Sequence, residues 1–180
     1  MAAVRVAMVA GEASGDLLGG RLIEALGRRI PGASFAGIGG PRMIAAGLES
    51  WYPQERLAVR GFVEVLRHLR EILALRRDVA RRLLAAPPQL FLGIDSPEFN
   101  LGLERRLKTA GVSTAHMVSP QVWAWRKGRV HRIQRSVSQL LVLFPFEEAL
   151  YHGAGVGVTY VGHPLADEIP DRIDRAGVRV

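Results

Sequence analysis

The sequence predicts an α/β fold, a Rossmann-like doubly wound parallel sheet, and two observations carry that prediction. Short apolar runs alternate with longer amphipathic segments, as in repeated βα units. Most of the short runs are apolar on both faces, which is typical of parallel strands covered by helices on each side. With 180 residues, the chain is long enough for one domain with a substantial core.

The expected elements follow one another in a regular alternation. Strands are predicted at residues 4–10, 34–38, 89–94, 113–118, 139–144 and 157–161. Helices are predicted at residues 15–29, 41–46, 62–85, 99–110, 126–136 and 146–152. Beyond residue 161 the sequence is polar and charged, without a further element of useful length. We therefore expect a domain over residues 1–164 and a linker or tail over residues 165–180.

Composition and charge narrow the classes of function. The chain has no cysteine, which excludes disulfides and thiolate metal sites. Its net charge of +7 is carried almost entirely by arginine, which suits phosphate groups or an anionic membrane surface. Nucleic acid is the rival partner, but no helix-turn-helix, RNP or zinc signature is present, so none is expected. The apolar run at residues 4–10 is interpreted as a buried strand rather than a signal peptide, and no run reaches the ~18 apolar residues of a membrane span.

Ligands of such sheets bind at the carboxyl ends of the strands, so the residues after each strand are the candidates for a site. After the first strand, Gly11, Glu12, Ser14, Gly15 and Asp16 open a helix and are candidate substrate-binding residues. Glycines allow close backbone approach, and the N–H groups of a helix start suit an anion. A tight turn in which Ser14 or Asp16 caps the helix would explain the same residues. The spacing is not the dinucleotide fingerprint G-x-G-x-x-G.

Arg42 and Asp95 are the charged candidates in the next two loops. Arg42 follows two glycines and a proline, and is a candidate substrate contact. Asp95 ends the third long strand, where a carboxylate can take a proton from a substrate hydroxyl. We prefer Asp95 as the catalytic base, with Glu98 and Asn100 as alternative polar groups in the same loop. Capping of the next helix is the structural alternative for Asp95.

The loop after the fourth long strand supplies Ser119, Trp123, Trp125 and Arg126 as candidate substrate contacts. Two tryptophans beside cations suit a boundary between apolar and charged surroundings, although one ring could fill the core and the other cap it. His116, just before this loop, is expected to be a satisfied core histidine. The segment 144–148 reads as an ordinary helix start with a mainly structural role.

The predicted helix 62–85 has an apolar stripe edged by arginines. The candidate membrane or acyl-chain contacts on it are Phe62, Val65, Leu66, Leu69, Ile72 and Leu73. Such a stripe can lie in a membrane interface, but packing on a sheet is the commoner cause. Val63, Leu75, Val79 and Leu83 widen the apolar face beyond what one sheet contact needs, which favours a membrane role for part of it.

Seven segments taken in series resemble one family. They are VAGEASGD at 9–16, GGPRM at 39–43, GFVEVL at 61–66, GIDSPEFN at 93–100, VSPQVWAWR at 118–126, LFPFE at 143–147 and YVGHPLAD at 160–167. In this order they resemble the lipid-A-disaccharide synthase family, glycosyltransferases of the GT-B type. The resemblance implies the N-terminal domain of a GT-B fold. It also implies sugar transfer from a UDP-linked diacylglucosamine to diacylglucosamine 1-phosphate, with inversion, Asp95 as base, and no metal or cofactor.

The resemblance also implies partners and a location. The partners are the acylated glucosamine phosphate acceptor, the UDP-diacylglucosamine donor and the anionic inner-membrane surface, where the protein would be cytoplasmic and peripheral. A UDP-binding half is expected to be absent from this chain, so we expect little activity from it alone, and an exposed apolar face that favours a homodimer. A non-catalytic phosphosugar- or nucleotide-binding domain and a transferase for another lipid-linked sugar are the alternatives.

Overall fold

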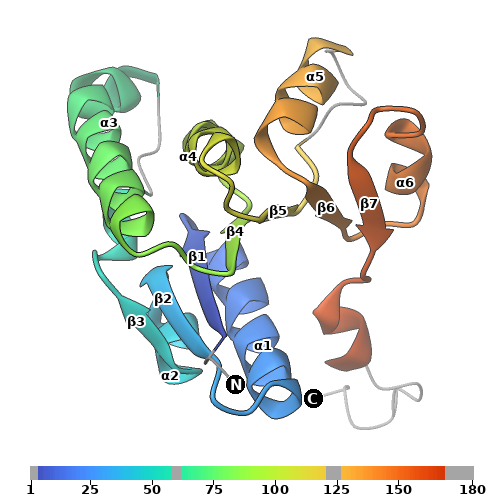
Figure 1. The fold of residues 1–180 in the computed structure, drawn as a ribbon, viewed down its shortest axis with the longest axis horizontal. Coiled ribbons are helices and arrows are strands. Elements are labelled where there is room, and N and C mark those ends of the chain that lie inside the picture. Colours follow the sequence, from blue (N-terminus) through green and yellow to red (C-terminus); the bar gives the residue numbers. More distant parts are fainter. Residues whose placement is uncertain (1–3, 58–61, 121–126, 169–180) are drawn as a thin grey trace, which may run out of the picture.

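One parallel sheet of seven strands organises the molecule. The computed structural model describes residues 4–57, 62–120 and 127–168. The strands are β1 (Arg5–Ala10), β2 (Ser34–Ile38), β3 (Leu48–Ser50), β4 (Leu90–Ile94), β5 (Thr114–Met117), β6 (Gln139–Val142) and β7 (Gly157–Tyr160). Their order is β3-β2-β1-β4-β5-β6-β7, and every neighbouring pair is parallel (Figure 1). The chain therefore winds in one direction from β1 to β3 and in the other from β4 to β7.

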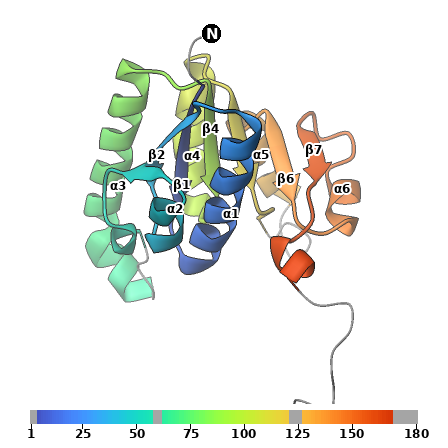
Figure 2. The same cartoon turned by 90° about the horizontal axis from the view of Figure 1, so that it is seen from below.

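Helices cover both faces of this sheet. They are α1 (Ala13–Arg29), α2 (Pro41–Ala45), α3 (Phe62–Ala85), α4 (Pro97–Thr109), α5 (Lys127–Ser136) and α6 (Phe146–Leu150), with 3₁₀ helices at Gln54–Arg56 and Pro164–Glu168. Helices α1 and α2 pack on one face, and α3 and α4 pack on the other (Figures 1 and 2). This arrangement confirms the predicted doubly wound, Rossmann-like α/β fold.

Strand β1 shows why the short runs are apolar on both faces. Val6 and Met8 point into the cluster that α1 and α2 cover, whereas Ala7 and Val9 point into the cluster beneath α3 and α4. Successive side chains of a strand alternate between its two faces, and each face here is covered by helices. An apolar side chain is therefore required at every position of a central strand.

Proline and glycine set the ends of the helices. Pro31 follows the C-cap of α1, and the next residue, Gly32, has a φ of +83°. Helix α4 starts with Pro97, whose missing N–H costs nothing at a first helical position, and ends before Gly111, whose φ is +87°. These residues stop each helix where the chain must turn back toward the sheet.

The six predicted strands and six predicted helices are all present, with ends that agree to within two residues. Strand β3 was not predicted, because three residues are too few to show an alternating pattern. It adds an edge strand to the sheet by pairing with β2, from Phe35 opposite Leu48 to Gly37 opposite Ser50. Sequence alone carried no signal for this pairing.

Candidate active site

The carboxyl ends of β1 and β4 lie side by side at the point where the strand order reverses. Ala10 at the end of β1 is paired with Ile94 at the end of β4, so the loops that begin at Gly11 and Asp95 are neighbours. A methyl group added to Gly11 would lie 2.4 Å from the Ser96 hydroxyl oxygen, which shows how closely the two loops approach. Ligands of open α/β sheets bind in the crevice at such a switch point.

Asp95 is anchored through its main chain at this switch point. Its N–H donates a hydrogen bond to the Met117 carbonyl at 2.9 Å, and its carbonyl accepts one from the Asn100 side-chain amide at 2.8 Å. Its half-buried carboxylate accepts no hydrogen bond from any residue that the structure describes. A fixed backbone and an unengaged carboxylate leave the side chain able to accept a proton or a hydrogen bond from a ligand.

Backbone strain is concentrated at the same edge of the sheet. Among the described residues, the three non-glycine residues with positive φ are Asp95 at +54°, Ser96 at +45° and Val118 at +78°. The first two follow β4 and the third follows the neighbouring strand β5. Positive φ is costly for residues other than glycine, above all for β-branched valine, and such strain clusters at binding and catalytic sites.

A buried asparagine holds these loops together. Asn100 is fully buried on α4, and its Nδ2 lies within hydrogen-bond distance of the carbonyl oxygens of Val9, Ile94 and Asp95, at 3.2, 3.5 and 2.8 Å. One amide therefore joins β1, β4 and the residue after β4. Asn100 was predicted only as an alternative polar group of the loop, but its burial and contacts make it an anchor for Asp95.

A buried acid–imidazole pair lies one helical turn further along α4. Glu104 Oε1 and His116 Nδ1 are 2.7 Å apart, and neither residue is exposed to solvent. Burial raises the pKa of the Glu104 carboxyl above its ordinary value, against the opposing effect of His116. Among the described residues, Glu104 Oε2, His116 Nε2 and Asn100 Oδ1 are buried atoms without a hydrogen-bond partner. The burial of His116 agrees with its interpretation as a core histidine, but the histidine is not fully satisfied, because only its Nδ1 has a partner among the described residues. Sequence reasoning did not identify that partner.

The Asp16 side chain forms structural hydrogen bonds with the start of α2. Its buried carboxylate accepts hydrogen bonds from the main-chain N–H groups of Gly40, Arg42 and Met43, at 2.8, 3.0 and 3.0 Å. It therefore caps α2 from a position on α1. The idea that Ser14 or Asp16 caps α1 is wrong: the N-cap is Glu12, and no side-chain capping bond is formed there within the described part of the chain. A contact of Asp16 with substrate stays a prediction.

The other candidate contacts after β1, and Arg42 in α2, differ in how far they are exposed to solvent. Glu12 and Ser14 are exposed, whereas Gly15 is buried where a methyl group would lie 3.3 Å from the Ile94 carbonyl oxygen. The Arg42 side chain is exposed beside the start of α2. These positions leave Glu12, Ser14 and Arg42 accessible to a ligand.

Gln54 supports this loop and was missed by sequence reasoning. Its side-chain amide donates to the carbonyl oxygens of Ala10 and Glu12, at 3.1 and 2.9 Å. Gln54 lies in a 3₁₀ helix more than 40 residues further along the chain. Only the folded chain brings it to the β1 loop, so no local pattern could have indicated it.

The remaining predicted contacts divide into described and undescribed residues. The Ser119 hydroxyl lies 2.6 Å from the hydroxyl of Tyr151, a phenol whose pKa is raised chiefly by burial. Trp123, Trp125 and Arg126 lie outside the described residues. In the segment 144–148, Glu147 accepts hydrogen bonds from the N–H groups of Leu143 and Phe144, which confirms the structural role predicted there.

The long helix α3 is partly a core helix. Leu75, Val79 and Leu83 are buried against β1 and β4 side chains, so the idea that they widen a membrane face is wrong. Ile72 packs partly against the same cluster and Leu73 is half-buried, whereas Leu69 is 42% exposed. The side chains of Phe62, Val65 and Leu66 lie outside the described ones.

Neither a membrane-spanning helix nor a metal cluster is found in the described parts of the chain. No helix there is both long and apolar enough to cross a bilayer. No three of its histidine, aspartate and glutamate side chains are grouped so that they could hold a metal ion.

The fold and the site define a Rossmann-like α/β domain with an unengaged carboxylate at its switch point. Comparison with known proteins then identifies the family, because the family model for lipid-A-disaccharide synthetase matches residues 6–179. The chain belongs to this family.

Curated relatives agree with this assignment. The lipid-A-disaccharide synthases of Dechloromonas aromatica and Paraburkholderia xenovorans are 56% and 54% identical over 98% of this chain. The one of Thiobacillus denitrificans is 58% identical over 91% of it. The matches cover 46%, 46% and 44% of these relatives, so the chain spans about half the length of the curated relatives that it matches.

Proposed function

We propose that this chain is the acceptor-binding part of an inverting glycosyltransferase that makes lipid A disaccharide 1-phosphate. The donor is UDP-2,3-diacylglucosamine, and the acceptor is 2,3-diacylglucosamine 1-phosphate. The observation that carries the proposal is the Asp95 carboxylate, which follows β4 at the switch point, on an anchored backbone and without a partner among the described residues. Family membership supports the choice of substrates.

Asp95 acts as the general base in this proposal. Its carboxylate takes the proton of the acceptor 6-hydroxyl as that oxygen attacks the anomeric carbon of the donor. The bond between this carbon and the UDP oxygen breaks from the opposite face, and UDP leaves with the electron pair. One positioned base is sufficient for such a direct displacement. The anchored backbone keeps the carboxylate in place. The base then needs no reorientation during the reaction, which would otherwise lower the rate.

The other candidates surround the reacting groups. Gly11, Glu12, Ser14 and Gly15 border the acceptor beside Asp95, while Arg42 offers a cation to a phosphate group. Asp16 contributes by capping α2, the helix that carries Arg42. Ser119, Trp123, Trp125 and Arg126 contact the acylated sugar from the loop after β5. Residues 1–164 form the acceptor domain in this proposal, and residues 165–180 are an inter-domain linker or tail.

A matched pair of substitutions tests the base. Asp95→Asn is expected to lower kcat by about 10²–10⁴-fold with little change in acceptor affinity, because the amide cannot accept the proton. Glu98→Gln, in the first turn of α4, changes an exposed side chain that is paired with Arg132; it is the control and should leave kcat unchanged. The assay uses this chain joined to the remaining half of the Dechloromonas relative.

Three results would contradict the proposal. Full turnover by Asp95→Asn with intact acceptor binding would mean that this domain binds the phosphosugar but does not supply the catalytic base. Loss of turnover in Glu98→Gln alone would move the base to Glu98. Turnover by this chain alone at the rate of the joined protein would refute the need for a UDP-binding half.

We also propose that the N-terminal part of α3 contacts the cytoplasmic face of the inner membrane. Leu69 is 42% exposed, and Leu73 lies one turn further along the helix. An apolar edge flanked by arginines suits an anionic interface. Leu69→Glu together with Leu73→Glu should reduce flotation with anionic liposomes, with Leu150→Glu, which is also exposed, as the control. Unchanged flotation would contradict this contact.

A further inference from the structure

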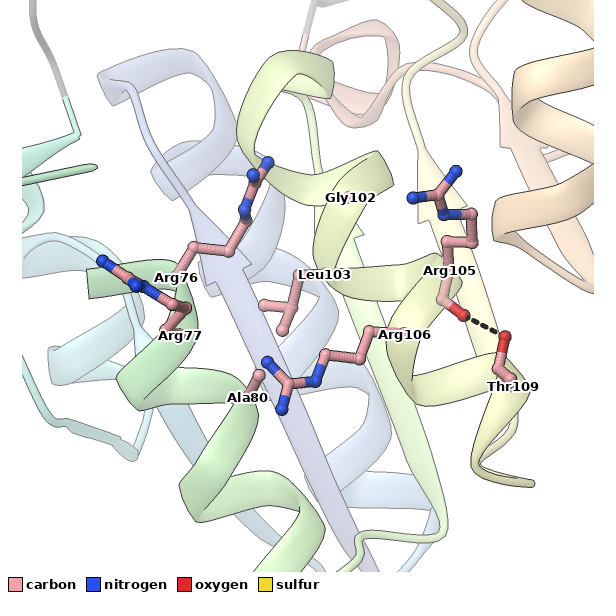
Figure 3. A pocket seen from close by; sticks show the side chains of 8 residues that line it. All are labelled: Arg76, Arg77, Ala80, Gly102, Leu103, Arg105, Arg106 and Thr109. Atoms are coloured by element: carbon pink, nitrogen blue, oxygen red, sulfur yellow. Dashed lines mark hydrogen bonds between the residues drawn. The ribbon is translucent and has the colours of Figure 1, made fainter. Parts of the chain in front are cut away.

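An arginine-rich pocket lies between α3 and α4 on the outer helical layer. It has a volume of about 450 Å³ and is lined by Arg76, Arg77, Ala80, Gly102, Leu103, Arg105, Arg106 and Thr109. Figure 3 shows Arg76 reaching from α3 and Arg106 reaching from α4 into the space between the two helices. Arg77 and Arg105 point to either side. The catalytic proposal uses none of these residues.

The pocket holds positive charge without a compensating acid. Its lining includes four arginines and no aspartate or glutamate, and none of the four forms an ion pair within the described residues. Arg76 donates a long hydrogen bond of 3.4 Å to the Glu98 carbonyl, and Arg77 donates one to the Leu73 carbonyl. These neutral acceptors leave the charges uncompensated.

Arg76 is held in an environment that disfavours its charge. Burial lowers the pKa of its guanidinium, and the nearby cations Arg132 and Arg105 lower it further. An anion in the pocket would relieve this repulsion. Beneath the arginines, Ala80 and Leu103 are buried and apolar, so part of the pocket wall screens charge poorly and strengthens attraction to an anion.

Gly102 makes room for the Arg76 guanidinium. A methyl group added to Gly102 would lie 2.5 Å from Arg76 Nη1 and 3.1 Å from its Cζ. The absence of a side chain on α4 therefore allows the Arg76 guanidinium to lie against this helix. This close fit distinguishes the pocket from arginines that extend freely into solvent.

We propose that this pocket binds a phosphate monoester group, with Arg76 and Arg106 as its principal ligands. Guanidinium pairs with phosphate through two parallel N–H···O bonds, and two arginines from facing helices match the charge of a dianion. The volume accommodates the phosphate together with an attached glycerol or sugar unit. The phosphate comes from an anionic lipid headgroup or from a soluble phosphate ester.

Calorimetric titration of this chain with inorganic phosphate at constant ionic strength tests the site. One phosphate per chain is expected, and the double variant Arg76→Gln/Arg106→Gln should bind it about tenfold or more weakly. The control is Arg28→Gln/Arg29→Gln, which removes the same charge from exposed positions at the end of α1. This control should bind phosphate like the original chain. Equal weakening in both double variants, or no phosphate binding at all, would overturn the proposal.

Gly102→Ala tests whether phosphate binding depends on the position of the Arg76 guanidinium or only on the net charge of the chain. The added methyl displaces the Arg76 guanidinium and leaves every charge in the chain, so phosphate binding should weaken while the melting temperature is kept. Gly27→Ala is the matched control, because a methyl group there meets nothing within 4 Å. Unchanged phosphate binding by Gly102→Ala would overturn the placement of the anion beside Arg76.

Vesicles distinguish the two sources of phosphate. Binding to phosphatidic acid vesicles that free phosphate competes for, and that Arg76→Gln/Arg106→Gln selectively lowers, would assign the site to a lipid headgroup. Phosphate binding without such an effect on vesicles would assign it to a soluble phosphate ester, and either result supports the site. Displacement of phosphate by a single-stranded oligonucleotide at much lower concentration would instead make it a nucleic-acid site and overturn the proposal.

Discussion

Asn100 donates its side-chain amide to the main-chain carbonyl of Asp95 at 2.8 Å, and thereby ties the proposed base to helix α4. The same amide lies near two other carbonyl oxygens at the ends of β1 and β4. Replacing it with a methyl group leaves these acceptors without their donor in a buried place. Such a loss costs on the order of 1–3 kcal/mol.

Asn100→Ala should therefore reduce both stability and activity. We expect the free energy of unfolding in urea to fall by about 1–3 kcal/mol, and kcat of the joined protein to fall although Asp95 is present. Glu98→Gln on the same helix is the control for both measurements. Unchanged stability and unchanged kcat in Asn100→Ala would show that the amide does not position the base.

Asp16→Ala tests the capping of α2 by a carboxylate on α1. Three main-chain N–H groups lose a charged acceptor, and we expect the free energy of unfolding to fall by about 2–4 kcal/mol. Asp16→Asn keeps one acceptor oxygen, so its free energy of unfolding should lie between those of Asp16→Ala and the original chain. A stable Asp16→Ala protein with weakened acceptor binding would instead favour a role in substrate binding.

Glu104 makes the stability of the chain depend on pH. Burial raises its pKa in the folded state above the ordinary 4.5, so the folded state holds a proton that the unfolded state releases. The stability from this group is complete below about pH 4.5 and is lost as pH rises through the raised pKa. We therefore expect the free energy of unfolding in urea to fall for the original chain, relative to Glu104→Gln, as pH rises through the raised pKa of Glu104. Parallel stability profiles of the two proteins would contradict this assignment.

Gly37→Ala tests a close approach of two strands. Gly37 has a φ of +148°, and a methyl group there would lie 1.9 Å from the Met8 main-chain oxygen. Backbone atoms cannot move aside like the end of a side chain, so we expect a loss of at least ~3 kcal/mol or failure to fold. Gly27→Ala, in open space on α1, should be neutral or slightly stabilising in thermal unfolding. Similar melting temperatures for the two variants would contradict this reading of Gly37.

Substitution of Phe144 and Phe146 tests the self-association that the sequence led us to expect. Their rings are stacked, with centroids 5.7 Å apart, and they are 50% and 57% exposed. Phe144→Ser/Phe146→Ser should shift light-scattering masses toward the monomer at high concentration, because apolar area is removed from the surface. Ile44→Ser, at an equally exposed residue distant in sequence, is the control. An unchanged mass distribution would exclude this pair as a contact between copies.

Much of the fold could be predicted because its signals are local. Runs such as Val6–Val9 of β1 are apolar on both faces, and Pro97 and Gly111 mark the limits of a helix within a few residues of it. The place of Asp95 at a carboxyl strand end follows from the same local pattern. The three-residue strand β3 lacked such a pattern and was recognised only by its pairing with β2.

The sequence by itself determined the alternation of elements, the family and the position of the proposed base, since each depends on short motifs and on their order along the chain. Only the tertiary structure decided that Asp16 caps α2, that Gln54 holds the β1 loop, and that Glu104 meets His116. It also brought Arg76 and Arg106 to one pocket from separate helices. The physical reason is that a buried polar group must find a partner, and that partner is chosen by proximity in the folded chain, whatever their separation in sequence.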